Sequence, residues 1–533
     1  MGTRWFIGTA LVVSCALFAA SCGSSGGGGE RAATTTAGNN GSGVTTTSAS
    51  STSAAATLAA TPANIDEWEK LWATERAAVV KRIKDNKWGK SSDGKTLTGP
   101  EGFRIDLSKC GPGWSDTEGL TDTEIKIGGT SPQSGTAADF GYVAKASDPY
   151  FKYYAAKGLF KDSTGKTRTK VNFTYRDDVY DPAKTIPLVD ELLDSEKVFA
   201  LWVTGTPNGL KVYDKINSRC VPNPLLIGGS PAWGDPVNHP WTTGSLMSYG
   251  TEATIWMAFI EQHIDELTKG KNKAVVAGFV ANSEFGATYE SSFRAALAQS
   301  PVKDKIDFVT ERVEITAPTV TDPMTTLASK NPDIFFTMSG GAQCPQIISE
   351  AANNGMKQKT KYLFMSSVCK SASYVGKAKV GGDGSAADGW YIVGGGLKDF
   401  NSDAMASDSF VAWGRKFLAD NGLDYKASGN LGAGLYYAWT WVQALIIAGE
   451  LDGGLTRTNL IVAQRAISGT NPLLLPGIKF NMNGNSDPYF VEGSDLSVWN
   501  AAQQGWVQKG NVIELSGKTK PCAWDLSAQA CKG

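Results

Sequence analysis

Histidine is nearly absent from this sequence: the 533 residues contain two, His239 and His263. Neither lies at a zinc-ligand spacing, which disfavours a zinc enzyme and a hydrolase that depends on a catalytic histidine. A basic excess is also missing, because 51 Lys and Arg residues face 52 Asp and Glu residues and the formal net charge is -1. This balance disfavours a nucleic-acid-binding function.

Apolar runs long enough to span a membrane are missing after the N-terminus. The nearest is 435–448, whose tyrosines and tryptophans are typical of a buried helix. The first 22 residues have an export-signal pattern, with Arg4, an apolar stretch at 5–18 and small residues before Cys22. This pattern resembles a bacterial lipoprotein signal, which implies that Cys22 is acylated and becomes the mature N-terminus. Ala19 departs from the usual Leu, and a simple secretory signal is the alternative.

Residues 23–63 are rich in Gly, Ser, Thr and Ala, a composition that cannot bury enough apolar surface to fold. We expect a flexible tether there. Residues 64–120 are expected to form an N-terminal helical extension, because 65–84 has helical spacing and a face of mixed charge.

Six cysteines remain after the signal and Cys22 are set aside, and an even number in an exported chain predicts disulfides. Cys522 and Cys531 are local. Cys344 and Cys369 each follow a strand pattern, so they lie at one sheet edge, whereas Cys110 and Cys220 each precede one, at the opposite edge. We predict the pairs Cys110–Cys220, Cys344–Cys369 and Cys522–Cys531.

Strand and helix patterns alternate from residue 124 onward, which is typical of parallel sheets. The first series has strands at 124–128, 170–176, 198–203 and 225–227 and helices at 142–157, 183–195 and 207–217. The second series has strands at 274–280, 308–314, 333–338 and 362–365 and helices at 252–267, 285–298, 321–329 and 343–353. A strand at 389–394 is expected to return to the first series, followed by helices at 405–421, 431–448 and 456–467 and by a tail, 477–480 and 496–507, that alternates as a β-hairpin would.

These patterns predict an α/β fold with two Rossmann-like lobes, each built on a parallel sheet. Lobe 1 comprises 121–246 and 390–488, and lobe 2 with the C-terminal tail comprises 247–389 and 489–533. The chain crosses between the lobes near Gly244, Tyr391 and Pro488. A ligand would bind at the carboxyl ends of the strands, between the lobes.

Three catalytic motifs are weighed and set aside. Residues 89–96 fit a nucleotide-binding loop, but a charged helix precedes them and no helix pattern follows. Ser367 and Lys370 fit S-x-x-K without its companion motifs. Asp177 and Asp178 are adjacent at a strand end, which points them to opposite faces and favours loop hydrogen bonds over catalysis.

The succession IKIGGTSPQSG, TYRDDVYDP, VFALWVTGTPNG and NPLLIGGSPAWGDP resembles the branched-chain-amino-acid-type substrate-binding proteins of ABC transporters. FVANSEFGATYE, PDIFFTMSGGAQCPQIISEAANNGM and KYLFMSSV continue the resemblance, which covers about 120–520. It implies the two-lobed type I periplasmic-binding-protein fold, with no cofactor and no catalysis.

The resemblance also implies a ligand site, in which the first lobe holds a carboxylate and the second lobe closes over it. The residues carried over are Ser134, Thr204, Gly205, Thr206, Ser230, Ala232, Phe285, Gly341, Ala342 and Val368. Gly and Ser in the first-lobe loops allow close approach of the backbone, and helix N-termini favour an anion.

One departure leaves the ligand open. Amino-acid binders of this family have an acidic residue near Val368 for the ammonium group, and Val offers no counter-charge. Glu284 or Asp235 could substitute. Trp202 and Trp233 could instead line a wall for an apolar ligand, or simply pack in the core.

We therefore expect an extracytoplasmic receptor, anchored to the cell membrane by lipid, that captures a small polar or amino-acid-like solute and delivers it to ABC permease subunits. A ligand-sensing receptor domain is one alternative. A secreted hydrolase that uses Ser367 or the Asp177–Asp178 pair is another.

Overall fold

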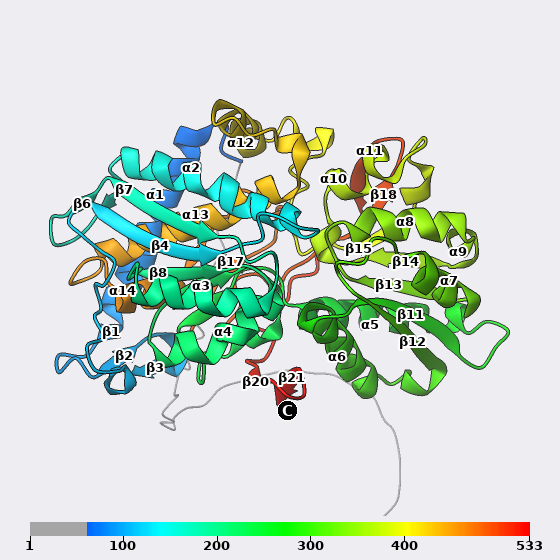
Figure 1. The fold of residues 1–533 in the computed structure, drawn as a ribbon, viewed down its shortest axis with the longest axis horizontal. Coiled ribbons are helices and arrows are strands. Elements are labelled where there is room, and N and C mark those ends of the chain that lie inside the picture. Colours follow the sequence, from blue (N-terminus) through cyan, green and yellow to red (C-terminus); the bar gives the residue numbers. More distant parts are fainter. Residues whose placement is uncertain (1–60, 533) are drawn as a thin grey trace, which may run out of the picture. The chain divides into compact units, whose positions relative to one another are not determined.

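The computed structural model describes residues 61–532. The predicted signal, Cys22 and residues 23–60 of the predicted tether lie outside the described residues. Residues 61–533 form one unit, in which two α/β lobes lie side by side (Figure 1).

The first lobe is built on a parallel sheet. Its strands are, in sheet order, β7 (Lys170–Arg176), β4 (Glu124–Thr130), β8 (Ala200–Val203), β9 (Asn223–Leu226) and β10 (Thr242–Gly244). The β9–β10 pair continues the sheet because the Ile227 N–H donates to the Val203 carbonyl at 3.1 Å. All carboxyl ends of these strands therefore lie at one edge.

Helices cover both faces of this sheet. α2 (Tyr142–Ala156) and α13 (Asn430–Glu450) pack on one face, with α14 (Arg457–Arg465) and α12 (Ser409–Asp420) beyond, and α3 (Pro182–Asp194) and α4 (Thr206–Ser218) pack on the other. Among the described residues α13 alone is long and apolar enough to span a membrane, but 94% of its apolar window is buried. The prediction of a buried helix in this stretch is confirmed.

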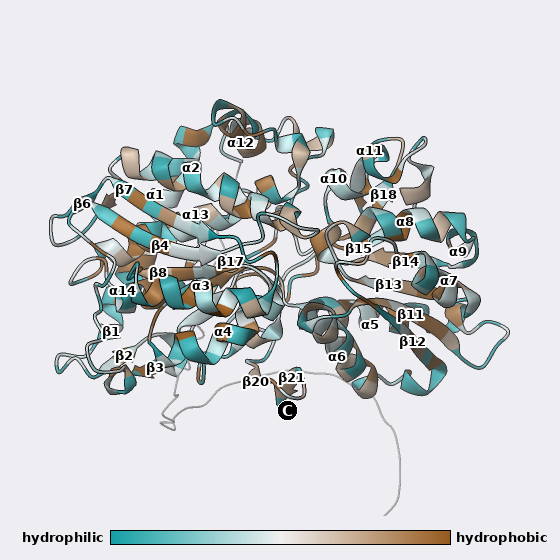
Figure 2. Ribbon diagram, in the orientation of Figure 1, coloured by the Kyte–Doolittle hydropathy of each residue, from teal (hydrophilic) through white to brown (hydrophobic). Residues whose placement is uncertain are grey.

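The second lobe has one mixed sheet. Its strands are, in order, β12 (Ile306–Val313), β11 (Ala274–Ala281), β13 (Ile334–Met338), β14 (Tyr362–Met365), β15 (Tyr391–Val393), β18 (Leu496–Asn500) and β19 (Gly505–Gln508). The first five are parallel, and β18 and β19 form an antiparallel hairpin within the predicted stretch 496–507, whereas Phe480, in the other stretch predicted for the hairpin, pairs with Gly469. Helices α5 (Tyr249–Leu267) and α6 (Glu284–Gln299) lie on one face, and α7 (Thr321–Ser329) and α8 (Gln343–Asn353) lie on the other. Figure 2 shows that the apolar residues of both lobes concentrate on the strands and the inward faces of the helices.

The placement of β15 corrects the sequence prediction. The stretch 389–394 was expected to return to the first lobe, but β15 pairs with β14 in the second sheet, so the crossing lies at 394–397 rather than at Tyr391. Gly395 and Gly396 turn the chain there with φ of 63° and 69°, which glycine adopts without strain. The other crossings follow β10 and precede β18, near the expected Gly244 and Pro488.

The N-terminal extension is part of the first-lobe core. α1 (Ile65–Asp85) begins at the N-cap Asn64, whose side chain accepts from the Glu67 N–H. Trp72 is fully buried, stacks on Trp68 and meets Trp439 of α13 edge to face. Strands β1 (Gly89–Lys90), β2 (Thr96–Thr98) and β3 (Arg104–Asp106) follow as an antiparallel sheet. Residues 89–96 are thus a hairpin rather than a phosphate-binding loop.

The remaining elements are short. They are β5 (Phe160–Lys161), β6 (Thr167–Arg168), α9 (Met356–Lys359), α10 (Ala372–Val375), α11 (Lys377–Val380), β16 (Ser468–Gly469), β17 (Phe480–Asn481), β20 (Ala523–Asp525) and β21 (Ala530–Lys532).

The three disulfides match the predicted pairs. Cys110–Cys220 ties the N-terminal extension to the loop before β9, Cys344–Cys369 joins α8 to the loop after β14, and Cys522–Cys531 closes the β20–β21 hairpin.

Candidate functional site

A cavity of about 130 Å³ lies between the lobes, at the carboxyl ends of the strands. Its first-lobe wall begins where β8 ends and α4 begins. Gly205 has φ of 102°, and a Cβ there would come within 2.7 Å of the Tyr180 ring, so only glycine fits this turn. The turn directs the N-terminus of α4 at the cavity, and its N-cap has no side-chain hydrogen bond.

Thr206 is the polar group at this end of the cavity. It is 1% exposed, and its Oγ1 has no hydrogen-bond partner among the described residues. A Cβ on Gly228 would lie 2.8 Å from that oxygen, so glycine keeps the approach open. An unpaired hydroxyl beside the positive end of a 13-residue helix favours an anionic or hydrogen-bonding ligand group.

Aromatic rings surround this polar group. Tyr249 lies against Phe285, with ring centroids 5.4 Å apart, and Phe140 lies 5.7 Å from Tyr180. All four rings line the cavity, two from each lobe. Trp202 and Trp233 do not line it: both are buried in the first-lobe core, where the Trp202 Nε1–H donates to the Leu225 carbonyl.

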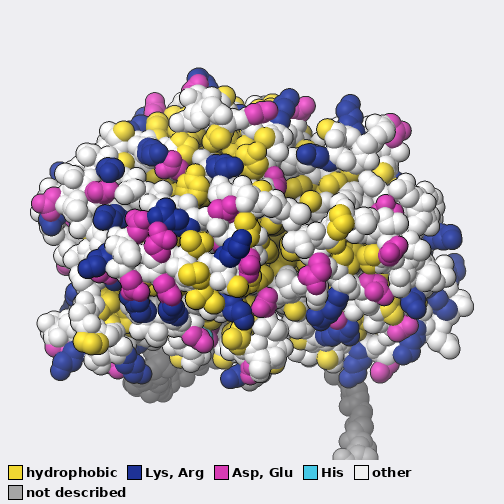
Figure 3. Space-filling view, in the orientation of Figure 1, with side chains coloured by type: hydrophobic (Ala, Val, Ile, Leu, Met, Phe, Trp, Pro, Cys, Tyr) yellow, Lys and Arg dark blue, Asp and Glu magenta, His cyan; other side chains and the backbone are white. Residues whose placement is uncertain are grey.

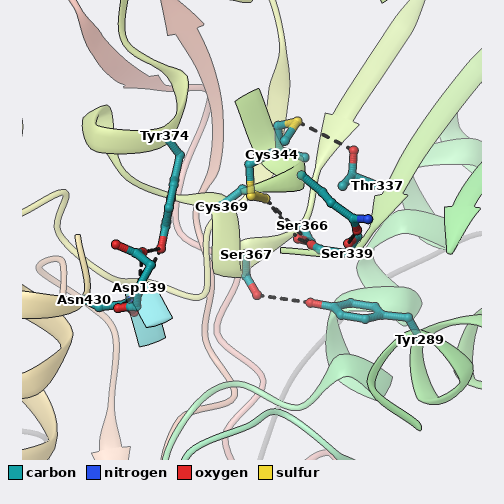
Figure 4. Close-up of a disulfide and its surroundings, with 12 residues drawn as sticks. Asp139, Tyr289, Thr337, Ser339, Cys344, Ser366, Ser367, Cys369, Tyr374 and Asn430 are labelled. Carbon is teal, nitrogen blue, oxygen red and sulfur yellow. Dashed lines mark hydrogen bonds between the residues drawn. A yellow bond between two sulfur atoms is a disulfide. The ribbon is translucent and has the colours of Figure 1, made fainter. Parts of the chain in front are cut away.

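The second-lobe wall rests on a buried carboxylate. Glu252 of α5 is fully buried and accepts from the Ser367 N–H at 2.9 Å, the Ser367 hydroxyl at 2.7 Å and the Tyr289 hydroxyl at 2.8 Å. Burial raises the pKa of Glu252 to about 7, against the lowering effect of these hydrogen bonds. Glu252 therefore fixes Ser367 on the cavity wall (Figure 4 shows Ser367 directed at Tyr289).

The far end of the cavity carries charged groups that are already paired. Lys370 Nζ binds both oxygens of Asp495 at 2.7 Å, and Lys398 Nζ binds Asp408 at 2.7 Å. Asp399 accepts from the Ala372 N–H at 2.9 Å and the Asn401 N–H, and burial raises its pKa to about 6.

Hydrogen bonds join the lobes at the rim of the cavity. Asn430, at the start of α13, donates to Asp139 at 2.9 Å and to the Tyr374 hydroxyl at 2.8 Å, and Tyr374 also donates to Asp139 (Figure 4). Tyr374 belongs to the second lobe, whereas Asp139 and Asn430 belong to the first. Figure 3 shows apolar side chains near the middle of the view, with Lys, Arg, Asp and Glu intermixed toward both ends.

Five of the ten residues predicted from the resemblance line the cavity: Thr204, Gly205, Thr206, Phe285 and Val368. The other five are not among its lining residues. Ser134 is exposed and donates to Asp177 at 2.5 Å. Ser230 caps the 3₁₀ turn Pro231–Gly234, and Ala232 is buried in it.

Gly341 and Ala342 lie before α8. A Cβ on Gly341 would be 3.4 Å from the Phe140 ring of the opposite lobe, so this glycine lies beside a cavity-lining ring without lining the cavity itself.

The two acids considered as ammonium partners are also outside the lining. Asp235 accepts from His239 Nδ1 at 3.0 Å and from Asn238, and Glu284 begins α6. Glu252 and Asp399 were not found from the sequence, and Lys370 was considered only as part of the S-x-x-K motif. The available signal was an acid within the apolar helix pattern of 252–267.

The catalytic alternatives have no supporting geometry. Ser367 donates to Glu252, Lys370 is paired with Asp495, and the intervening Cys369 is in a disulfide. Asp177 accepts from loop N–H groups, whereas Asp178 accepts from the Tyr180 N–H and two buried side chains. Within the described residues no cluster of three or more His, Cys, Asp or Glu side chains could hold a metal.

Comparison with known proteins gives one family match. Residues 124–484 match the family model described as periplasmic binding protein. A search of curated proteins found no match.

Solved structures share the fold at low identity. A fatty acid ABC transporter substrate-binding protein from Thermomonospora curvata is 18% identical, with a TM-score of 0.59, over 76% of this chain and 96% of that one. A branched chain amino acid ABC transporter protein from Thermus thermophilus with bound valine is 17% identical, with a TM-score of 0.59, over 74% and 97%. A solute binding protein from Rhodopseudomonas palustris HaA2 in complex with p-hydroxybenzoic acid is 18% identical, with a TM-score of 0.57, over 74% and 98%.

Proposed function

The chain belongs to the periplasmic binding protein family, whose members are non-enzymatic solute-binding proteins, and we propose that it is the lipid-anchored receptor of an ABC importer. In this proposal a small organic solute binds between the lobes, the lobes close over it, and the complex delivers it to the permease. The cavity between the lobes is the observation that carries the proposal.

Thr206 and the N-terminus of α4 are proposed to hold the polar head of the solute. The buried hydroxyl lacks a hydrogen-bond partner within residues 61–532, and the helix end supplies N–H groups and a positive partial charge. Thr204, Gly205, Phe285 and Val368 are proposed to form the surrounding wall. The related structures are described with a fatty acid, valine or p-hydroxybenzoic acid, so a carboxylate head is common to their ligands.

Closure is proposed to use the three crossings between the lobes. The bonds of the Tyr374 hydroxyl to Asn430 and Asp139 at the rim cross between the lobes, so they are proposed to stabilise the closed state together with the ligand.

A thermal-shift screen tests the solute site, with amino acids, aromatic acids, short carboxylates and amides as probes. A true ligand raises the unfolding midpoint because it binds the folded state only. Thr206→Val keeps the side-chain shape and removes the hydroxyl, so it should weaken binding of that ligand by about ten- to a hundredfold.

The matched control is Ser218→Ala at the other end of α4, which should leave the affinity unchanged. A screen without any midpoint shift, or equal affinity in Thr206→Val, would contradict the proposed site.

The lipid anchor is tested separately. Cys22→Ser should release the protein from the membrane fraction, whereas Cys15→Ser, within the signal, should not. Retention of the Cys22 variant in the membrane would argue for a different anchor.

A further inference from the structure

Polar groups around the interlobe cavity favour an anion, and the acid in its described lining, Asp399, already accepts two backbone hydrogen bonds. We propose that the cavity selects a compact carboxylic acid with an apolar body and no ammonium group, in preference to an amino acid. This selectivity rests on the function proposed above and narrows its solute class.

The end of the cavity that we propose binds the ligand carboxylate is formed by neutral groups. Thr206 presents its unpaired hydroxyl at the start of α4, and the nearest lining rings are Tyr180 and Tyr249. In an amino acid the ammonium lies one carbon away from the carboxylate, so it would have to be accommodated among these groups. None of them carries a negative charge.

The nearest first-lobe acid is already engaged. Asp178 is fully buried and does not line the cavity. It accepts from the Tyr180 N–H at 3.0 Å, the Thr185 hydroxyl at 3.0 Å and Asn208 Nδ2 at 2.9 Å. A ligand ammonium would reach this carboxylate only by displacing those donors.

The buried acid of the second lobe, Glu252, lies behind the side chains that line the cavity. Glu252 accepts three hydrogen bonds from Ser367 and Tyr289, and only Ser367 lines the cavity. Its raised pKa, about 7, also leaves much of the group neutral near neutral pH. Glu252 thus positions Ser367 rather than facing the ligand.

Of the described residues that line the cavity, Asp399 is the one acid, and it lies at the far end, beside Lys370 and Lys398. Its two oxygens accept from Ala372 and Asn401 N–H groups. Lys370 and Lys398 flank the same end and would repel a second cation. Burying an ammonium without a carboxylate partner is costly, so the lining disfavours an amino acid.

The rest of the lining suits an apolar body. Ile227, Leu246, Leu397, Phe400, Ala433 and Leu473 form this part of the wall. A volume of about 130 Å³ is close to that of cavities that hold benzene, roughly 150 Å³. The cavity therefore fits a branched short-chain or single-ring acid.

Matched ligand pairs test the proposal by calorimetry on the mature full chain. 4-Methylpentanoate and leucine differ only in the ammonium group, and benzoate and benzamide differ only in the acidic head. We expect 4-methylpentanoate to bind at least tenfold more tightly than leucine, and benzoate at least tenfold more tightly than benzamide. Equal or tighter binding of leucine would overturn the proposal while leaving the solute-receptor function intact.

A charge placed on the second-lobe wall gives an independent test. Val368→Asp introduces a carboxylate, and Val368→Asn is its uncharged control of nearly equal size. The Asp variant should bind 4-methylpentanoate at least tenfold more weakly than the Asn variant, with both variants retaining the unfolding midpoint of the parent within a few degrees. Equal affinities in the two variants would contradict an anion-selective cavity, and binding of no probe to the parent chain would contradict the receptor function itself.

Discussion

Glu252 is a buried carboxylate that is stabilised by hydrogen bonds from hydroxyl and amide donors instead of by a cation. Tyr289 and Tyr249 are the titratable groups packed against it, and neither supplies positive charge. Burial raises the pKa of Glu252 from 4.5 to about 7, so the folded state binds its proton more tightly than the unfolded state does.

The raised pKa of Glu252 in the folded state determines how the stability depends on pH. The contribution of Glu252 is fully present below about pH 4.5 and is lost as the pH rises through 7. At about 1.4 kcal/mol per pKa unit, the free energy of unfolding should fall by about 3 kcal/mol more in the parent than in Glu252→Gln between pH 4.5 and 8.5. Urea unfolding at several pH values measures the difference.

Asp304→Asn, in the exposed 3₁₀ turn Lys303–Lys305 before β12, is the control and should follow the parent curve. Asp399 and Asp487 also have raised pKa values, but they remain in every variant and cancel in the comparison. Parallel curves for the parent and Glu252→Gln would show that Glu252 does not titrate in this range.

Individual side chains also show which site residues could be predicted from the sequence and which could not. Thr206, Phe285 and Ser230 were predicted from the family resemblance, and the first two follow the carboxyl end of a strand and line the cavity. Ser230 also follows a strand, but its hydroxyl accepts from the Ala232 N–H and the turn packs inward. The direction of a loop depends on its tertiary packing, which the local pattern does not contain.

At the scale of elements, periodicity located most strands and helices and did not say which sheet a short strand joins. β7, β14, α7 and α8 have the predicted bounds, because long apolar patterns with clear turn signals determine them. β15 has three residues, too few to carry a hydrophobic pattern that is specific to either lobe. It pairs with β14 because the chain path after α11 brings it beside that strand. Its assignment to the first lobe was therefore wrong.

α1 illustrates how a segment before the family match becomes part of the fold. The family model begins at residue 124, yet Trp72 is fully buried against Trp439 of α13, and Arg76 donates to Gln443 at 2.6 Å. Glu75 accepts from Thr470 on the loop after β16. The extension is thus fixed to the helix whose N-terminus reaches the cavity rim.

At the scale of the whole molecule, the C-terminal hairpin contacts both lobes. The Cys522 N–H donates to the Gly234 carbonyl at 2.8 Å, and Trp524 is buried with Trp233 in the first lobe. On the other side the Ser291 hydroxyl of α6 donates to the Gln529 carbonyl at 2.6 Å. The hairpin therefore forms a clasp between the lobes, which Figure 1 shows below the crossings.

This clasp is expected to limit how far the lobes open. The Cys522–Cys531 disulfide closes a loop of 9 residues' separation, and its removal should destabilise the hairpin by about 2–3 kcal/mol. Once the hairpin frays, the first-lobe and second-lobe contacts are no longer joined.

The double variant Cys522→Ser with Cys531→Ser should therefore have a larger ligand-free radius of gyration by small-angle scattering and weaker ligand binding, because opening lowers the population of the closed state. Ser291→Ala removes only the second-lobe contact and should give a smaller expansion, whereas Ser527→Ala, whose hydroxyl bonds within the hairpin, should give none. If the double variant scatters like the parent, the clasp does not restrain the lobes and the crossings alone determine the opening.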